Sequence, residues 1–186
     1  MTYPSFSSGD ILTAADMNGV GLWKIATVSL SGVTNNIDNV FSSSYDNYRI
    51  VISGLNNATT TTRTVVLRFR TTTTDTSANY IQTERFIYPL NNGADGASVG
   101  NTSAKLLVLS NWSTGGAGVS IDVYNPNKAA GTGYVGQAFS YQSDVATWVA
   151  RHIAGGINVS TAFTGFSIIG ATDNLSGTVR VYGYRD

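Results

Sequence analysis

The alternation of apolar and polar residues in many short runs constrains the fold of this sequence most strongly. The clearest run is Thr64–Arg70, where Val65, Leu67 and Phe69 fall on one side of an extended chain. Successive side chains of a strand point to opposite faces, so this pattern predicts a strand with one buried face. About ten such runs occur, at residues 23–30, 48–52, 64–70, 84–88, 105–109, 119–124, 134–141, 147–153, 163–169 and 178–184.

Turn-forming residues separate these runs. The separators are rich in glycine and asparagine and lie at residues 54–57, 91–93, 115–116 and 131–133. Helical segments do not alternate with the runs, which argues against a parallel α/β sheet. The sequence therefore predicts an all-β fold, an antiparallel jelly-roll-like β-sandwich over residues 23–186.

The composition supports a sheet protein and excludes several function classes. The chain has 186 residues, of which only 12% are charged, with a formal net charge of +0, one glutamate (Glu84) and no cysteine. Scarce glutamate and lysine disfavour helices, and a neutral chain has no electrostatic attraction to nucleic acid or anionic membranes. Without cysteine there is no disulfide framework and no thiolate metal site. No apolar run suits membrane insertion, so we expect synthesis in the cytoplasm of the producing cell without secretion.

The N-terminal segment, residues 1–22, differs from the body. Thr13 followed by Asp16 resembles a helix capping box, and Asn18-Gly19 is a plausible stop, which together predict a short helix. A helix of one or two turns is unstable alone, so it must pack on another surface. We therefore expect residues 1–22 to form an anchoring arm, either on its own domain or on an assembly partner. The side chains available for burial are Phe6, Ile11, Leu12 and Met17.

A search for catalytic chemistry finds few of the parts that it needs. His152 is the one histidine, so one chain cannot build a histidine metal cluster, and no Gly-x-Ser-x-Gly nucleophile motif occurs. The ten aspartates are scattered, mostly through expected loops. Residues 91–96 resemble a calcium loop without its downstream glutamate, and we interpret them as a turn. The sequence thus predicts no catalytic residue, no cofactor and no metal, with His152 as a structural or surface side chain.

Two further features allow alternative interpretations. Trp112, in a turn-rich stretch, is the best candidate for contact with a ligand such as a sugar, although a tryptophan more often packs in a core or an interface. The threonine runs 59–62 and 71–74 flank the strand Thr64–Arg70 and suit either strand extensions or solvated loops.

Three stretches resemble a family of bacteriophage virion accessory proteins. Phe6–Asn18 is similar to a segment near the N-terminus of tail-fibre and minor tail proteins. Val40–Ile52 resembles the first core strands of this virion family, and Ser176–Tyr184 resembles the way its chains end. The resemblance implies a virion protein that is often trimeric. The coiled-coil or collagen-like shaft of many fibres is absent from the sequence.

Three function hypotheses follow. The first is a tail-associated fibre or receptor-binding module of a phage virion, and the second is a capsid decoration protein. The third is a carbohydrate-active enzyme, which the missing catalytic parts disfavour. The expected partners are further copies of the chain in a homotrimer, other virion proteins, and a host surface glycan or receptor. Neither nucleic acid nor membrane insertion is expected.

Overall fold

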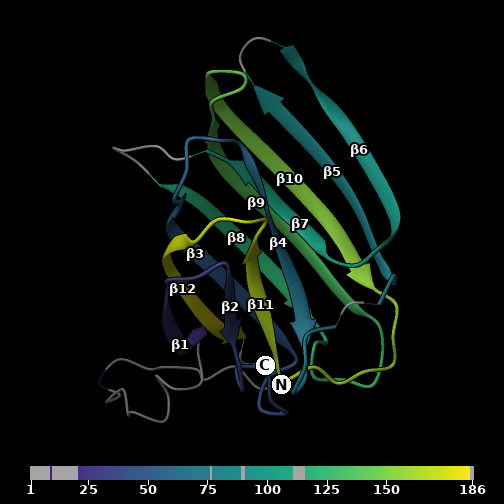
Figure 1. Ribbon diagram of the computed structural model, residues 1–186. Coiled ribbons are helices and arrows are strands. Elements are labelled where there is room, and N and C mark those ends of the chain that lie inside the picture. Colours follow the sequence, from purple (N-terminus) through teal and green to yellow (C-terminus); the bar gives the residue numbers. More distant parts are fainter. Residues whose placement is uncertain (1–8, 10–20, 76, 89–90, 111–115, 185–186) are drawn as a thin grey trace.

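A computed structural model describes residues 9, 21–75, 77–88, 91–110 and 116–184. The side chains of residues 88 and 91–93 are outside this description. Within these limits the protein is all-β, with twelve antiparallel strands in two sheets and no helix (Figure 1). Accordingly, no described helix is long and apolar enough to cross a membrane.

The larger sheet has eight strands. Their order across the sheet is β1 (Leu22–Leu30), β12 (Leu175–Tyr184), β3 (Asn47–Asn57), β8 (Ala117–Tyr124), β9 (Thr132–Gln142), β10 (Thr147–Ile157), β5 (Tyr80–Tyr88) and β6 (Asn91–Asn101). Every neighbouring pair is antiparallel.

The smaller sheet has four strands and packs against one face of the larger sheet. Its order is β2 (Thr34–Ile37), β11 (Gly165–Gly170), β4 (Arg63–Arg70) and β7 (Ala104–Leu109). In Figure 1 this sheet lies in front of the larger one, and β5 and β6 extend to one side of it. The edge strand β7 contacts β9, β10 and β5 of the larger sheet.

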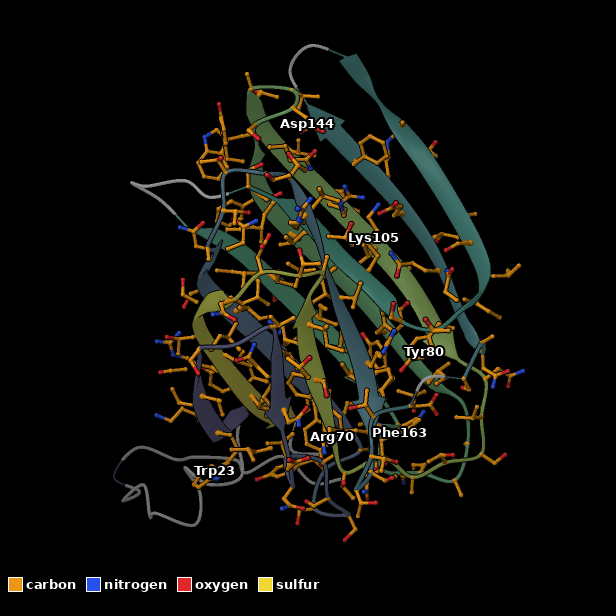
Figure 2. The ribbon with its side chains drawn as sticks, viewed as in Figure 1. Trp23, Arg70, Tyr80, Lys105, Asp144 and Phe163 are labelled. Carbon is orange, nitrogen blue, oxygen red and sulfur yellow. The ribbon has the colours of Figure 1, made fainter. Side chains whose placement is uncertain are left out.

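The core lies between the two sheets and follows the predicted alternation. Val65, Leu67 and Phe69 of β4 are fully buried. The Phe69 ring stacks on Tyr80 and Phe163 at centroid distances of 6.3 and 5.3 Å, and its backbone N–H donates to the Tyr80 hydroxyl at 2.8 Å (Figure 2). Tyr80 therefore joins the two sheets by a ring contact and a hydrogen bond that satisfies its buried oxygen.

The ten predicted strands are present, and two further strands were missed. Strand β2 is short and polar, and Asn35 on it bonds the turn before it, accepting from the Ser31 N–H at 2.9 Å and donating to the Gly32 carbonyl at 2.7 Å. Strand β6 is built from glycine, alanine, serine and asparagine, which carry no alternating apolar signal. Both strands form because their backbones pair with a neighbour, which side-chain patterning does not report.

Two predicted turns are wrong, because backbone pairing with a neighbouring strand places these residues in strands. Residues 91–96 lie in strand β6 instead of a turn, where Asp95 pairs with Arg85 and Gly96 with Glu84. Residues 54–57 belong to the end of β3, where Gly54 has a φ of 62° and the register with β8 shifts. Glycine tolerates this left-handed conformation without steric cost, so the strand continues through a bulge.

Four strands of the large sheet form two pairs that are consecutive in sequence. The pair β5 and β6 comes between β4 and β7 in the chain, and the pair β9 and β10 comes between β8 and β11. Without β5, β6, β9 and β10, the order is β1-β12-β3-β8 in one sheet and β2-β11-β4-β7 in the other. The inserted strands all follow β8 at one end of the large sheet, and we call them the extension.

Candidate functional site

Among the described residues, no second layer covers the face of the large sheet that points away from the small sheet, and we call it the open face. Side chains of β10 alternate between the two faces. Val149, Arg151 and Ile153 are buried, whereas Trp148 and His152 point to the other face and are exposed. Nine large hydrophobic residues are exposed among the described residues, and strand register places seven of them on this open face. The seven are Leu22, Ile81, Ile87, Tyr124, Val135, Phe139 and Trp148.

A polar hollow of about 910 Å³ lies in the open face over β3, β8, β9, β10, β5 and β6. Arg49 and Asp122 contribute to one side of it, and Arg85 and Asp95 to the other. Val135 and Ala154 form part of its apolar lining. Most of these strands belong to the extension, so the polar hollow depends on the inserted strands.

Asp122 is held by two partners at the rim of the polar hollow. Arg49 binds it through both carboxylate oxygens, at 2.8 and 2.7 Å, and the Tyr184 hydroxyl donates to the same carboxylate. The hydrogen bonds from Arg49 lower the pKa of Asp122, burial acts against this, and the Tyr184 hydrogen bond adds to the lowering. Burial and the hydrogen bond to Asp122 raise the pKa of Tyr184 to about 12. At neutral pH Asp122 is therefore ionised, whereas Tyr184 keeps its proton and can donate it to the carboxylate.

Ser120, Gln137 and His152 form a row across three neighbouring strands. Ser120 of β8 lies opposite Gln137 of β9, which lies opposite His152 of β10. All three side chains are exposed on the open face, and within the described part of the chain none makes a hydrogen bond. They offer a hydroxyl, an amide and an imidazole, which include donors and acceptors.

A second hollow of about 480 Å³ lies on the other side of this row and shares the same three residues. Its apolar lining includes Phe139, which is 51% exposed. The Phe139 ring lies over Gly118, because a Cβ at residue 118 would fall 2.4 Å from the ring atom Cε1. Phe139 also contacts Trp148, with ring centroids 5.8 Å apart.

Buried polar contacts attach the extension to the small sheet beneath the site. Glu84 of β5 bonds Arg151 of β10, whose side chain is 5% exposed, and lies 3.2 Å from the Lys105 ammonium of β7. The Gln82 side chain pairs with the Lys105 backbone through two hydrogen bonds of 2.9 Å. Arg151 also lies over the Phe86 ring at 5.0 Å. This network joins β5, β10 and β7, so it restricts how β5 and β10 can shift against the small sheet.

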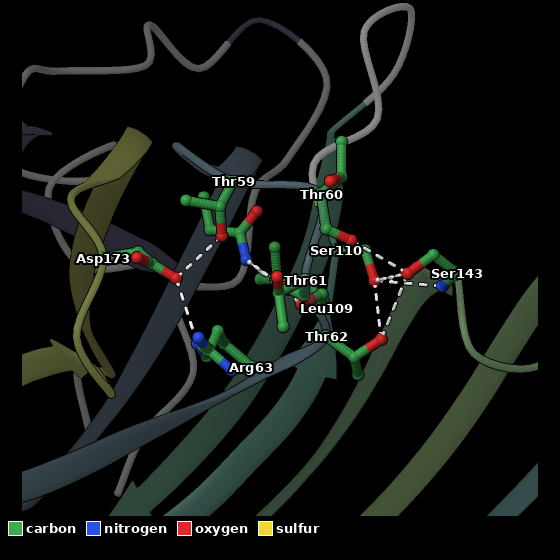
Figure 3. Close-up of polar contacts among 10 residues, drawn as sticks. Thr59, Thr60, Thr61, Thr62, Arg63, Leu109, Ser110, Ser143 and Asp173 are labelled. Carbon is green, nitrogen blue, oxygen red and sulfur yellow. Dashed lines mark hydrogen bonds and ion pairs between the residues drawn. The ribbon is translucent and has the colours of Figure 1, made fainter.

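A cluster of hydroxyl groups at another place links the threonine run 59–62 to neighbouring loops (Figure 3). The hydroxyls of Thr62, Ser110 and Ser143 form a triangle with separations of 2.9, 3.0 and 3.3 Å. Thr59 donates to Asp173 at 2.9 Å, and Arg63 reaches the same carboxylate oxygen at 3.2 Å. The run is therefore a loop whose side chains are partly bonded, instead of a simply solvated segment.

The residues singled out from the sequence have different positions. Phe6, Ile11, Leu12, Met17 and the expected helix lie outside the described residues, as does Trp112. His152 is in strand β10 as expected, and its side chain is exposed on the open face. Among the residues that the structure describes, no group of three or more histidines or acidic residues has the geometry of a metal site.

Sequence reasoning did not identify the row of Ser120, Gln137 and His152. Polar residues at outward positions of strands are ordinary, and only the register between β8, β9 and β10 reveals that these three are neighbours.

Neither a scan against models of known protein families nor a search of curated proteins gives a match to this sequence.

Proposed function

We propose that this chain is a structural module of a bacteriophage virion, associated with the tail, and that it contributes to host attachment through its open face. In this proposal the chain is not an enzyme, holds no cofactor, and presents His152 as a binding group. Its expected partners are two further copies, other virion proteins and a molecule of the host surface.

The observation that carries the proposal is the strand order. The eight strands outside the extension divide equally between the sheets, with order β1-β12-β3-β8 in one and β2-β11-β4-β7 in the other. This order supports a jelly roll, an eight-stranded double-sheet architecture found in viral capsid and lectin domains. A fold does not fix a function, so the remaining support has to come from the site.

The extension supports a role in binding. Four inserted strands widen only the large sheet, and they carry most of the polar hollow. Seven exposed large hydrophobic residues lie on the same face. A surface that is widened by insertions and carries exposed apolar groups is typical of an interaction site.

The proposed anchor is the arm of residues 1–22, with Phe6, Ile11, Leu12 and Met17 buried against the particle and a short helix formed there. The resemblance of Phe6–Asn18 to tail-protein segments favours the tail over a capsid decoration. A chain lacking residues 1–20 begins before β1, so it is expected to retain the folded sandwich and to lose incorporation.

Quantitative mass spectrometry of purified phage particles tests the location. A tail module is expected at a few copies per particle, and a decoration protein at a copy number near that of the major capsid protein. Absence from particles rejects the virion proposal, and normal incorporation of the chain lacking residues 1–20 rejects the anchor. Circular dichroism of the truncated protein checks that the sandwich is intact.

A further inference from the structure

We infer that the two hollows of the open face together bind an uncharged carbohydrate. This inference rests on the proposed attachment function and adds the site and the chemical class of the ligand. The row of Ser120, Gln137 and His152, shared by both hollows, is its centre.

The charges around the polar hollow are already paired. Arg49 is bound to Asp122 at 2.7 Å, and Arg85 lies 3.7 Å from Asp95. Glu84, the remaining charged residue in the lining, bonds Arg151 and Lys105 on the inner side of the sheet. Each cation in the lining has an anion as its partner, and each anion has a cation. A phosphate, carboxylate or ammonium group on a ligand therefore meets no unpaired opposite charge.

The unpaired groups of the site are neutral hydrogen-bonding side chains. Ser120, Gln137 and His152 are exposed, and the described chain leaves their donors and acceptors for an external partner. Because the three residues lie on adjacent strands, neighbouring members of the row are about 4.8 Å apart. A pyranose carries hydroxyls around its ring, and those on alternate carbons have a similar separation, so two or three of them can meet this row at once.

Apolar surfaces flank the row on both sides. Val135 and Ala154 line the polar hollow, and Phe139 lines the second hollow. The absence of a side chain at Gly118 leaves room for the Phe139 ring to lie down on β8. The C–H face of a sugar packs on such an aromatic surface, while its hydroxyls meet the polar groups.

Binding of the full-length chain to an array of immobilised neutral and anionic oligosaccharides tests the inference. The strongest neutral oligosaccharide is then titrated by calorimetry against the parent and the variants Gln137→Ala, His152→Ala and Phe139→Ala. Each variant is expected to weaken binding by about tenfold, because each removes a contact from the site. The matched control is Thr27→Ala, an exposed residue of β1 outside both hollows, which should bind as the parent does.

Charge provides a second measurement that is independent of the alanine variants. Parental binding is expected to change little with salt, since no ion pair forms with the ligand. Asp95→Asn leaves Arg85 without its anion and is expected to increase binding of anionic oligosaccharides. Circular dichroism of each variant separates a lost contact from a lost fold.

Three results overturn the inference: no neutral oligosaccharide bound at about millimolar concentration, parental preference for anionic oligosaccharides, or unchanged affinity in both Gln137→Ala and His152→Ala. Failure of the site and failure of the function remain distinguishable. Particles that contain the chain while it binds no neutral carbohydrate reject only the site. Carbohydrate binding by a chain that is absent from particles rejects only the virion role.

Discussion

At the scale of single residues, Asp122 shows how a charged side chain is held on the open face of the large sheet. It accepts from Arg49 and Tyr184, and the Arg49 guanidinium also lies 5.7 Å from the Tyr184 ring centroid. The three residues come from β8, β3 and β12, which are adjacent in the large sheet. The group therefore joins three strands on the open face of the large sheet.

Asp122→Asn is expected to destabilise the protein by about 1 kcal/mol at pH 7, since the ion pair is bidentate but partly exposed. The pKa of Asp122 is lowered by folding from its ordinary value of 3.8. Its contribution to stability is therefore fully present above pH 3.8 and is lost as the pH falls through the lower folded-state value. Urea unfolding at several pH values measures the difference between parent and variant.

The matched control is Asp95→Asn on the same face. Its partner Arg85 is 3.7 Å away, and both side chains are mostly exposed. Such a pair contributes less than about 0.5 kcal/mol. Equal losses in the two variants, or a loss in Asp122→Asn that persists unchanged at acidic pH, would contradict the assignment.

At the scale of elements, the threonine run 59–62 shows how hydrogen bonds between polar side chains attach a loop of the sandwich to its neighbours. Thr62 bonds Ser110 after β7, Ser143 after β9 and Asp144 in the same turn. Asn57, which is 4% exposed, donates to the carbonyls of Thr61 and Leu109 at 3.2 and 3.3 Å. Connections between both sheets are thus joined at one end of the molecule.

Thr62→Val keeps the shape of the side chain and removes its hydroxyl. Three hydrogen bonds lose their partner, so we expect a loss of about 1 kcal/mol in the free energy of unfolding. Thr61→Val is the control, because Thr61 accepts the Asn57 hydrogen bond through its backbone carbonyl and its side chain is exposed. That control should stay within about 0.5 kcal/mol of the parent. Equal stabilities of the two variants in urea would show that the triangle contributes nothing.

At the scale of the whole molecule, the extension makes the two sheets unequal. The large sheet has eight strands and the small sheet has four. The small sheet therefore covers only part of one face of the large sheet, and the opposite face is the open face. The large sheet also ends in two edge strands, β1 and β6, whose outer backbone groups have no partner strand within the described chain. Edges of this kind are commonly covered by a neighbouring molecule.

The proposed homotrimer has to leave the open face accessible, so we expect its contacts at the edges of the large sheet. Closed threefold symmetry repeats one interface and leaves no edge free. Light scattering of the full-length chain at micromolar concentration is expected to give the mass of three chains. A strict monomer, also in the presence of its docking partner on the particle, would reject the trimer.

The sequence by itself determined the fold class and most of the strands. Alternation in runs such as Thr64–Arg70 reports burial of one strand face, and this information is local. The core residues Val65, Leu67 and Phe69 followed directly from it. Strand β6 did not, because its small side chains bury no apolar stripe and its position depends on backbone pairing with β5.

Only the tertiary structure decided the site. Ser120, Gln137 and His152 are separated by 15 residues or more in the chain, and each is ordinary in its own strand. They become one row because β8, β9 and β10 pair in a single register. A shift of one residue would turn every side chain to the opposite face. Local patterning specifies which face of a strand is buried, whereas long-range pairing specifies which outward residues become neighbours.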